Sequence, residues 1–126
     1  MLKTYGLSHI NIPVQDLERS VSFYAQLFGM QEIRRFDDCV MLRTPGTHEV
    51  FTMTRSPEAA KLMAELEGFH FGFRLTGLVA IDKVLEDATQ LGGTPKSHGG
   101  TAEKGRVYAA VSDPNGYEVE IFWESD

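Results

Sequence analysis

The chain has 126 residues, 42% hydrophobic and 24% charged, which is the length and composition of one ordinary globular domain. Its formal net charge of −6 disfavours nucleic acid and anionic membrane surfaces as partners. The single cysteine, Cys39, excludes an intrachain disulfide and is expected to be a buried inert thiol, which fits a reducing compartment. No signal-peptide pattern and no apolar stretch of roughly 20 residues is found, so we expect a cytoplasmic protein that spans no membrane.

The first half begins with an alternating strand and a capped helix. Apolar and polar residues alternate over 7–14, with His9 on the polar face. Asp16 is expected to cap a helix that ends at Gly29. Short strands are predicted at 31–36, 39–43 and 49–54, and Ser56-Pro57-Glu58 is typical of the start of a short helix reaching about Leu66.

The second half repeats this order. Residues 69–75 alternate again, with three phenylalanines on one face and His70 on the other. A helical apolar stripe covers 79–91 and ends at Gly92-Gly93. Strands are predicted at 94–98, 106–112 and 117–123, the last preceded by the turn Asp113-Pro114-Asn115-Gly116.

The chain therefore reads as βαβββ twice, an α+β fold of two modules in tandem. We expect a single domain over 1–126, with module 1 at about 4–55, a linker helix at about 56–67 and module 2 at about 68–124. If apolar faces pack on helices, the polar faces line a shared concavity. That concavity would receive four equivalent residues, which are His9, Thr52, His70 and Glu120. Two imidazoles and one carboxylate suit a first-row divalent metal and leave positions open for water and substrate.

Three segments also resemble a known family. They are Gly6–Ser20 with the following Phe23-Tyr24 and Leu27–Met30, then Gly68–Phe73, and finally Asp113–Ile121. In this order they resemble the vicinal-oxygen-chelate superfamily of glyoxalases, bleomycin resistance proteins and extradiol dioxygenases. The resemblance implies the tandem βαβββ fold and a metal on Glu120 of the closing motif. It further implies a homodimer whose sites lie at the interface, with the first-strand histidine from one subunit and the other ligands from its mate.

Three further residues are candidates for catalysis. Arg74 shares a face with His70 and would clamp a substrate carboxylate or phosphonate, with a solvated arginine as the alternative. Tyr108 is a candidate hydrogen-bond donor, although the resemblance places the extradiol tyrosine two residues on, at Ala110. His98 precedes Gly99-Gly100-Thr101, which we expect to be a flexible loop over the site, and is a candidate base.

The resemblance implies an enzyme that binds a small oxygenated substrate through two vicinal oxygens on the metal. With Fe²⁺ we expect an extradiol-dioxygenase-like reaction, and with Mn²⁺, Ni²⁺ or Zn²⁺ a glyoxalase I-like isomerase or lyase. Thr52 stands where glyoxalase I enzymes carry a fourth ligand, and a contribution from Thr52 or Glu49 stays open. A fosfomycin-type thiol transferase and a metal-free drug-binding protein are further alternatives. The first would need a basic segment after Glu120, and the second typically lacks the triad that this chain keeps.

Overall fold

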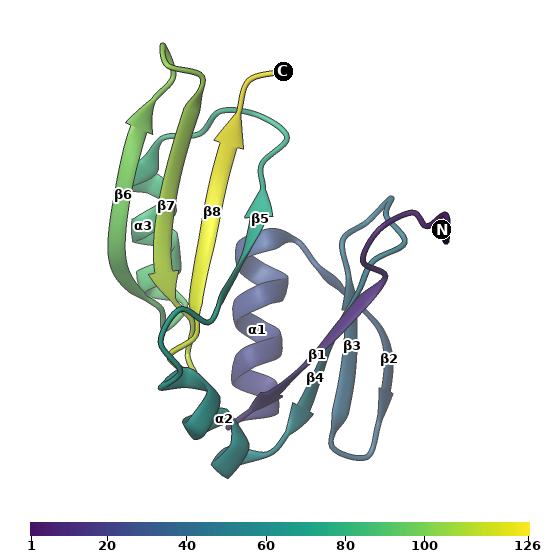
Figure 1. Cartoon of the computed structure of the whole chain (residues 1–126). Coiled ribbons are helices and arrows are strands. Elements are labelled where there is room, and N and C mark those ends of the chain that lie inside the picture. Colours follow the sequence, from purple (N-terminus) through teal and green to yellow (C-terminus); the bar gives the residue numbers. More distant parts are fainter. The chain divides into compact units, whose positions relative to one another are not determined.

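The computed structural model describes every residue from Met1 to Asp126, and its contacts divide the chain into two units, Met1–Ala60 and Lys61–Asp126 (Figure 1). The first unit contains β1 (His9–Val14), α1 (Leu17–Phe28), β2 (Gln31–Phe36), β3 (Cys39–Arg43) and β4 (Val50–Arg55). The helix α2 (Pro57–Ala64) runs from the first unit into the second, which continues with β5 (His70–Arg74), α3 (Ile81–Gln90), β6 (Thr94–Thr101), β7 (Arg106–Ser112) and β8 (Glu118–Glu124). None of these helices has the length and apolar character needed to cross a bilayer.

Each unit holds one four-stranded mixed sheet, in the order β1-β4-β3-β2 in the first and β5-β8-β7-β6 in the second. In both sheets the first and last strands of the unit pair in parallel, and the remaining pairs are antiparallel. A helix makes the crossover between the first two strands of each unit. The predicted fold of two βαβββ modules in tandem is therefore confirmed.

The strands pair in the same register within each of the two sheets. In the parallel pairs, Asn11 lies opposite Thr52 in the first sheet, and Gly72 lies opposite Glu120 in the second. Both outer hairpins carry a one-residue bulge at the matching place, at Ile33 in β2 and at Lys96 in β6. Because register and bulge both repeat, a residue of one sheet can be assigned its equivalent in the other.

The helix α1 has the ends that its sequence predicts. The Asp16 side chain accepts a hydrogen bond from the backbone N–H of Arg19 at 3.1 Å, and Gly29 ends the helix in the left-handed conformation at φ 68°. The helix lies against β3 and β4 and buries Ser20, Phe23 and Tyr24 there. The opposite face of the sheet, which carries His9 and Thr52, is therefore the face that α1 does not cover.

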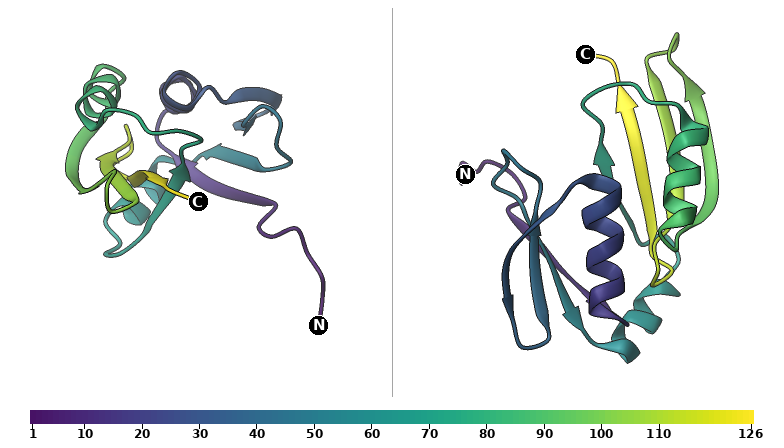
Figure 2. Two further views of the ribbon diagram at one scale, coloured as in Figure 1. Left: turned by 90° about the horizontal axis from the view of Figure 1, so that it is seen from above. Right: turned by 180° about the vertical axis from the view of Figure 1, so that it is seen from behind.

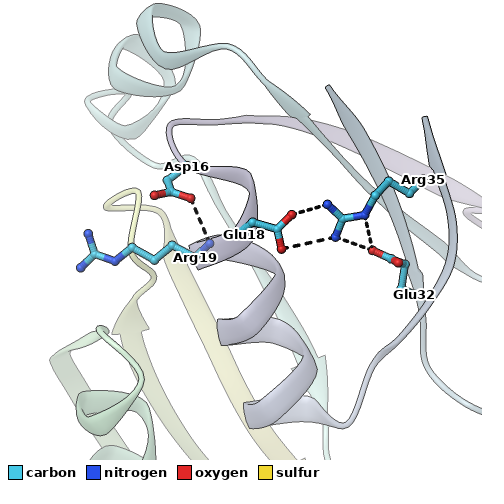
Figure 3. Close-up of polar contacts among 5 residues, drawn as sticks. All are labelled: Asp16, Glu18, Arg19, Glu32 and Arg35. Atoms are coloured by element: carbon cyan, nitrogen blue, oxygen red, sulfur yellow. Dashed lines mark hydrogen bonds and ion pairs between the residues drawn. The ribbon is translucent and has the colours of Figure 1, made fainter. Parts of the chain in front are cut away.

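A charged network ties the first turn of α1 to strand β2 (Figure 3). The Arg35 guanidinium donates to the carboxylates of Glu18 and Glu32, the latter at 2.8 Å from Nε. Hydrogen bonds to these two carboxylates hold the pKa of Arg35 well above its ordinary value. All three side chains are exposed, so the network contributes little to the stability of the unit.

The second unit is built the same way. The helix α3 covers one face of its sheet by contacting β6 and β7 (Figure 2, right). The Phe71 ring lies 6.4 Å from the Phe73 ring in β5 and 6.1 Å from the Phe69 ring just before the strand, as the alternation predicts. Before β8, the buried Asp113 carboxylate accepts from the backbone N–H groups of Asn115 at 2.8 Å and Tyr117 at 3.0 Å. This turn fixes where β8 starts and therefore where Glu120 points.

One predicted loop is a strand. Strand β6 continues to Thr101, so the expectation of a flexible loop at Gly99–Thr101 is wrong. The two glycines allow β6 and β7 to approach closely. A Cβ at Gly99 would lie 2.8 Å from the Tyr108 ring, and one at Gly100 would lie 2.1 Å from the Arg106 carbonyl oxygen. Glycine is therefore required by packing in the β6–β7 hairpin.

Candidate metal centre and adjoining clefts

The polar face of the first sheet carries His9 and Thr52. The Nδ1 atom of His9 shares a 2.6 Å hydrogen bond with Ser8 Oγ, and Nε2 makes none. Thr52 is only 7% exposed, and the structure gives its hydroxyl no hydrogen-bond partner. Both residues line a cleft of about 570 Å³ that also contains Asn11, Cys39 and Thr54. Cys39, which the sequence predicts to be a buried thiol, is half-buried and lines this cleft.

The polar face of the second sheet carries His70 and Glu120. His70 Nδ1 lies 2.9 Å from the carbonyl oxygen of Gly68, which can only accept, so Nδ1 carries the proton. A neutral ring then has its lone pair on Nε2, and that atom makes no hydrogen bond. This backbone contact is the kind that orients ligating histidines in metal sites.

Glu120 lies among small residues. Its neighbours across the sheet are Gly72 on β5 and Ala110 on β7. A Cβ at Gly72 would lie 3.2 Å from the Glu120 Cβ, so even alanine would crowd this point. The carboxylate is 29% exposed, and its one ion pair, with Arg106, is at the 4.0 Å limit. Glu120 is thus accessible and weakly engaged, as a metal ligand must be.

Tyr108 stands beside Glu120 on the same face. Its ring lies over Gly99 of the neighbouring strand, and its hydroxyl makes no hydrogen bond. Both residues line a cleft of about 520 Å³ completed by Gly100, Lys104 and Arg106. The phenol is therefore free to donate to a molecule in this cleft.

The structure divides the predicted triad between the units. His9 belongs to the first unit, and His70 and Glu120 belong to the second. Neither unit alone gathers three His, Cys, Asp or Glu side chains in a metal-binding group. The donors themselves fit a divalent metal, because both imidazoles keep Nε2 without a hydrogen bond and the carboxylate is accessible.

Arg74 and Glu49 point to other cavities. Arg74 donates to the Glu124 carbonyl and to the Asp126 carboxylate, both at 3.3 Å, and lines a cavity with Trp123. Glu49 precedes β4, its carbonyl accepts from Arg43 at 3.0 Å, and it lines a cavity separate from the one with Thr52. Neither side chain lines the clefts of the candidate ligands.

His98 lies on the wrong face for the role expected of it. It pairs with Ala109, which is buried on the other side of the sheet from Tyr108. The bulge at Lys96 shifts the alternation by one residue and turns His98 away from Glu120. His98 therefore does not share a face with Tyr108 and Glu120, which removes the geometric support for its predicted role as a base over the site.

Other residues of the site were not predicted. Arg106 alternates with Tyr108 along β7, so their shared face was a signal that the sequence offers. Lys104 sits in the turn before β7, where nothing in the sequence distinguishes it from a solvated lysine. Glu118 lies opposite His70 and pairs with Lys96 at 3.4 Å, which places a second carboxylate next to the histidine.

Comparison with known proteins identifies the family. Paired βαβββ modules with matched polar faces define one class of α+β protein, and residues 6–121 match the family model of the Glyoxalase/Bleomycin resistance protein/Dioxygenase superfamily. The chain belongs to this superfamily, as the sequence motifs predict.

Individual relatives carry different activities. The chain is 26% identical to a lactoylglutathione lyase of Escherichia coli O157:H7, covering 95% of this chain and 93% of the relative. It is 25% identical to a catechol-2,3-dioxygenase of Bacillus subtilis over 92% of this chain, but spans only 40% of that protein. It likewise spans 42% of lactoylglutathione lyase GLX1 of Arabidopsis thaliana. A solved structure of the fosfomycin resistance protein FosX from Listeria monocytogenes superposes with TM-score 0.78 at 19% identity, covering 98% of this chain and 96% of FosX.

Proposed function

We propose that the protein is a divalent-metal enzyme that binds a small substrate through two vicinal oxygens, with His9, His70 and Glu120 as metal ligands. The observation that carries this proposal is the repeated register, which gives each sheet one histidine and one facing residue at equivalent places. A second solved structure of FosX contains Mn(II) and a dihydroxypropylphosphonic acid, which supports a metal and a vicinal-oxygen ligand on this fold. A divalent cation held here would supply Lewis acidity for a developing negative charge on substrate oxygen.

The remaining groups of the face then position the substrate. The proton on His70 Nδ1 is held by Gly68, so the ring is fixed in one tautomer. Tyr108 donates a hydrogen bond to a substrate oxygen, and the small Gly72 and Ala110 leave room above Glu120. We assign no role in the reaction to Arg74 or His98.

The ligands come from the two units, so the proposal needs them brought together. We propose a homodimer with each site at the interface, in a single functional domain over residues 1–126 acting in the cytoplasm. The donation of His9 by one subunit and of His70 and Glu120 by its mate would satisfy the three-ligand set without any unit holding it alone.

An extradiol-dioxygenase-like reaction with Fe²⁺ fits best. Thr52 supplies no carboxylate at the place equivalent to Glu120, so the site has two histidines and one carboxylate, the ligand set of non-haem iron oxygenases. The chain is 25% identical to the catechol dioxygenase and 26% identical to the lyase, so sequence identity favours neither and the ligand set carries this choice.

A glyoxalase I-like lyase is the second candidate. One observation favours it: the chain spans 93% of the E. coli lactoylglutathione lyase, whereas it spans 40% of the dioxygenase. Against it stands Thr52, which does not supply a fourth ligand of the carboxylate type.

One experiment separates the two candidates. The protein is purified anaerobically, loaded in turn with Fe²⁺ and Ni²⁺, and assayed for oxygen uptake with catechols and for isomerisation of the methylglyoxal–glutathione adduct. Oxygen uptake with Fe²⁺ that is lost in Glu120→Gln supports the dioxygenase. Isomerisation with Ni²⁺ supports the lyase, and absence of both activities with every metal contradicts the proposed enzyme.

A further inference from the structure

The cleft beside Glu120 has more positive charge than the chain around it. The protein as a whole carries −6, yet this cleft is lined by two cations, Lys104 and Arg106, against one carboxylate. Lys104 makes no ion pair, and the only ion pair of Arg106 is the 4.0 Å contact with Glu120. Two cations that line one cavity and have almost no ion-pair partners are suited to binding a negatively charged ligand.

The cations are held on a rigid support. They flank Gly105 in the turn between β6 and β7, where the Gly105 carbonyl accepts from the Ser125 N–H at 2.9 Å. Within the turn, the Lys104 N–H donates to the Thr101 hydroxyl and carbonyl, each at 3.2 Å. The backbone of the hairpin tip is thus tied to the end of β8, and this sets the positions from which the Lys104 and Arg106 side chains extend.

We infer that the substrate carries an oxyanion group, a carboxylate or a phosphonate, which Lys104 and Arg106 bind beside Glu120. The inference deepens the proposed function and rests on it for the identity of the ligand as substrate. Arg74, which the sequence predicts for this task, is already engaged by Asp126 at another cavity. The hairpin tip supplies the anion-binding charge instead.

The cleft also orders the two ends of such a substrate. Arg106, Tyr108 and Glu120 share one face, with Tyr108 between the rows that carry the other two. An anion at Lys104 and Arg106 places the next few atoms of the molecule over the Tyr108 phenol and then at Glu120. Substrates therefore need their acid group a short chain away from the reacting oxygens.

Binding of anions to the full-length, metal-free protein tests this inference. Methylphosphonate, acetate and neutral acetamide are titrated separately and followed by amide chemical shifts in ¹H–¹⁵N NMR. The variant Lys104→Gln/Arg106→Gln is compared with Lys83→Gln/Lys3→Gln, which removes the same charge outside the cleft. Mn²⁺ affinity is measured in parallel for all three proteins.

We expect at least one anion to bind the wild type with its largest shifts at Gly100, Gly105 and Tyr108, and acetamide not to bind. The hairpin variant should bind that anion at least about tenfold more weakly, and the control variant should bind as the wild type does. A preference for methylphosphonate or for acetate identifies which acid group the cleft favours.

Equal weakening of anion binding in both variants, or chemical-shift changes outside the cleft, overturns the inference. Normal Mn²⁺ affinity without anion binding overturns the inference alone, whereas anion binding at the hairpin without Mn²⁺ affinity overturns the proposed metal centre alone.

Discussion

Thr52 occupies in the first sheet the place that Glu120 occupies in the second. Thr52 lies between Asn11 on β1 and Met41 on β3, as Glu120 lies between its two small neighbours on β5 and β7. Both side chains face the polar side of their sheets, and both line a cleft. A single substitution would therefore give the first sheet the carboxylate that it lacks.

Thr52→Glu is expected to add a fourth metal ligand. Because Thr52 is 7% exposed, a glutamate there is buried without a partner and costs about 1–3 kcal/mol in metal-free protein. Excess Mn²⁺ should return more stability to this variant than to the wild type, as measured by thermal unfolding with and without the metal. Thr54→Glu, two residues along the same face, is the control. An equal metal-dependent gain in both variants would contradict the equivalence of Thr52 and Glu120.

Gly72→Ala is expected to disturb the floor of the second cleft. A Cβ there would lie 2.8 Å from the Glu120 carbonyl oxygen, so β5 and β8 must separate at a cost of about 1–3 kcal/mol in unfolding free energy. Gly77→Ala is the matched control, because its Cβ would meet nothing within 4 Å. Urea unfolding of both variants measures the difference. If Gly72→Ala is no less stable than Gly77→Ala, the close approach at Glu120 is disproved.

Alkaline unfolding is expected to depend on Tyr117. Burial, with a smaller contribution from the Asp113 charge, raises the pKa of Tyr117 from 10 in the unfolded chain to about 12. The neutral phenol is thus favoured in the folded state. Its contribution is complete below pH 10 and is lost as the pH rises through about 12, to a total of about 3 kcal/mol.

The test compares wild type with Tyr117→Phe between pH 9 and pH 12. The variant lacks the ionising group, so its unfolding free energy should fall less steeply with pH in this window. Tyr5→Phe, at a fully exposed position, serves as the control. Parallel curves for wild type and Tyr117→Phe would refute the effect.

The helix and strand order could be predicted because local signals agree with the tertiary structure. Asp16 and Gly29 mark the two ends of α1 through capping geometry that needs only neighbouring residues. The face of His70 follows from strict alternation along β5, which has no bulge. Where the local rule acts alone, sequence and structure coincide.

The misassigned residues show where the local rule fails. Without the bulge at Lys96, alternation from Thr94 would place His98 on the face of Tyr108, and no residue type announces that bulge. The sequence predicts Gly99 in a loop, but the structure places it in β6, because glycine occurs both in flexible loops and at close approaches between strands. Lys104 is distinguished from an ordinary surface lysine only by the cavity that it lines.

The most direct test of the central claim is the affinity for one divalent metal, measured by Mn²⁺ titration of the wild type and of single variants. One Mn²⁺ per chain is expected for the wild type. His9→Ala, His70→Ala and Glu120→Gln should each weaken binding by at least about a hundredfold, since loss of a direct ligand exceeds the usual effect of an outer-shell change. His98→Ala, on the opposite face from Glu120, should bind as the wild type does. A wild-type protein that binds no divalent metal, or a His98→Ala variant as impaired as Glu120→Gln, would contradict the account.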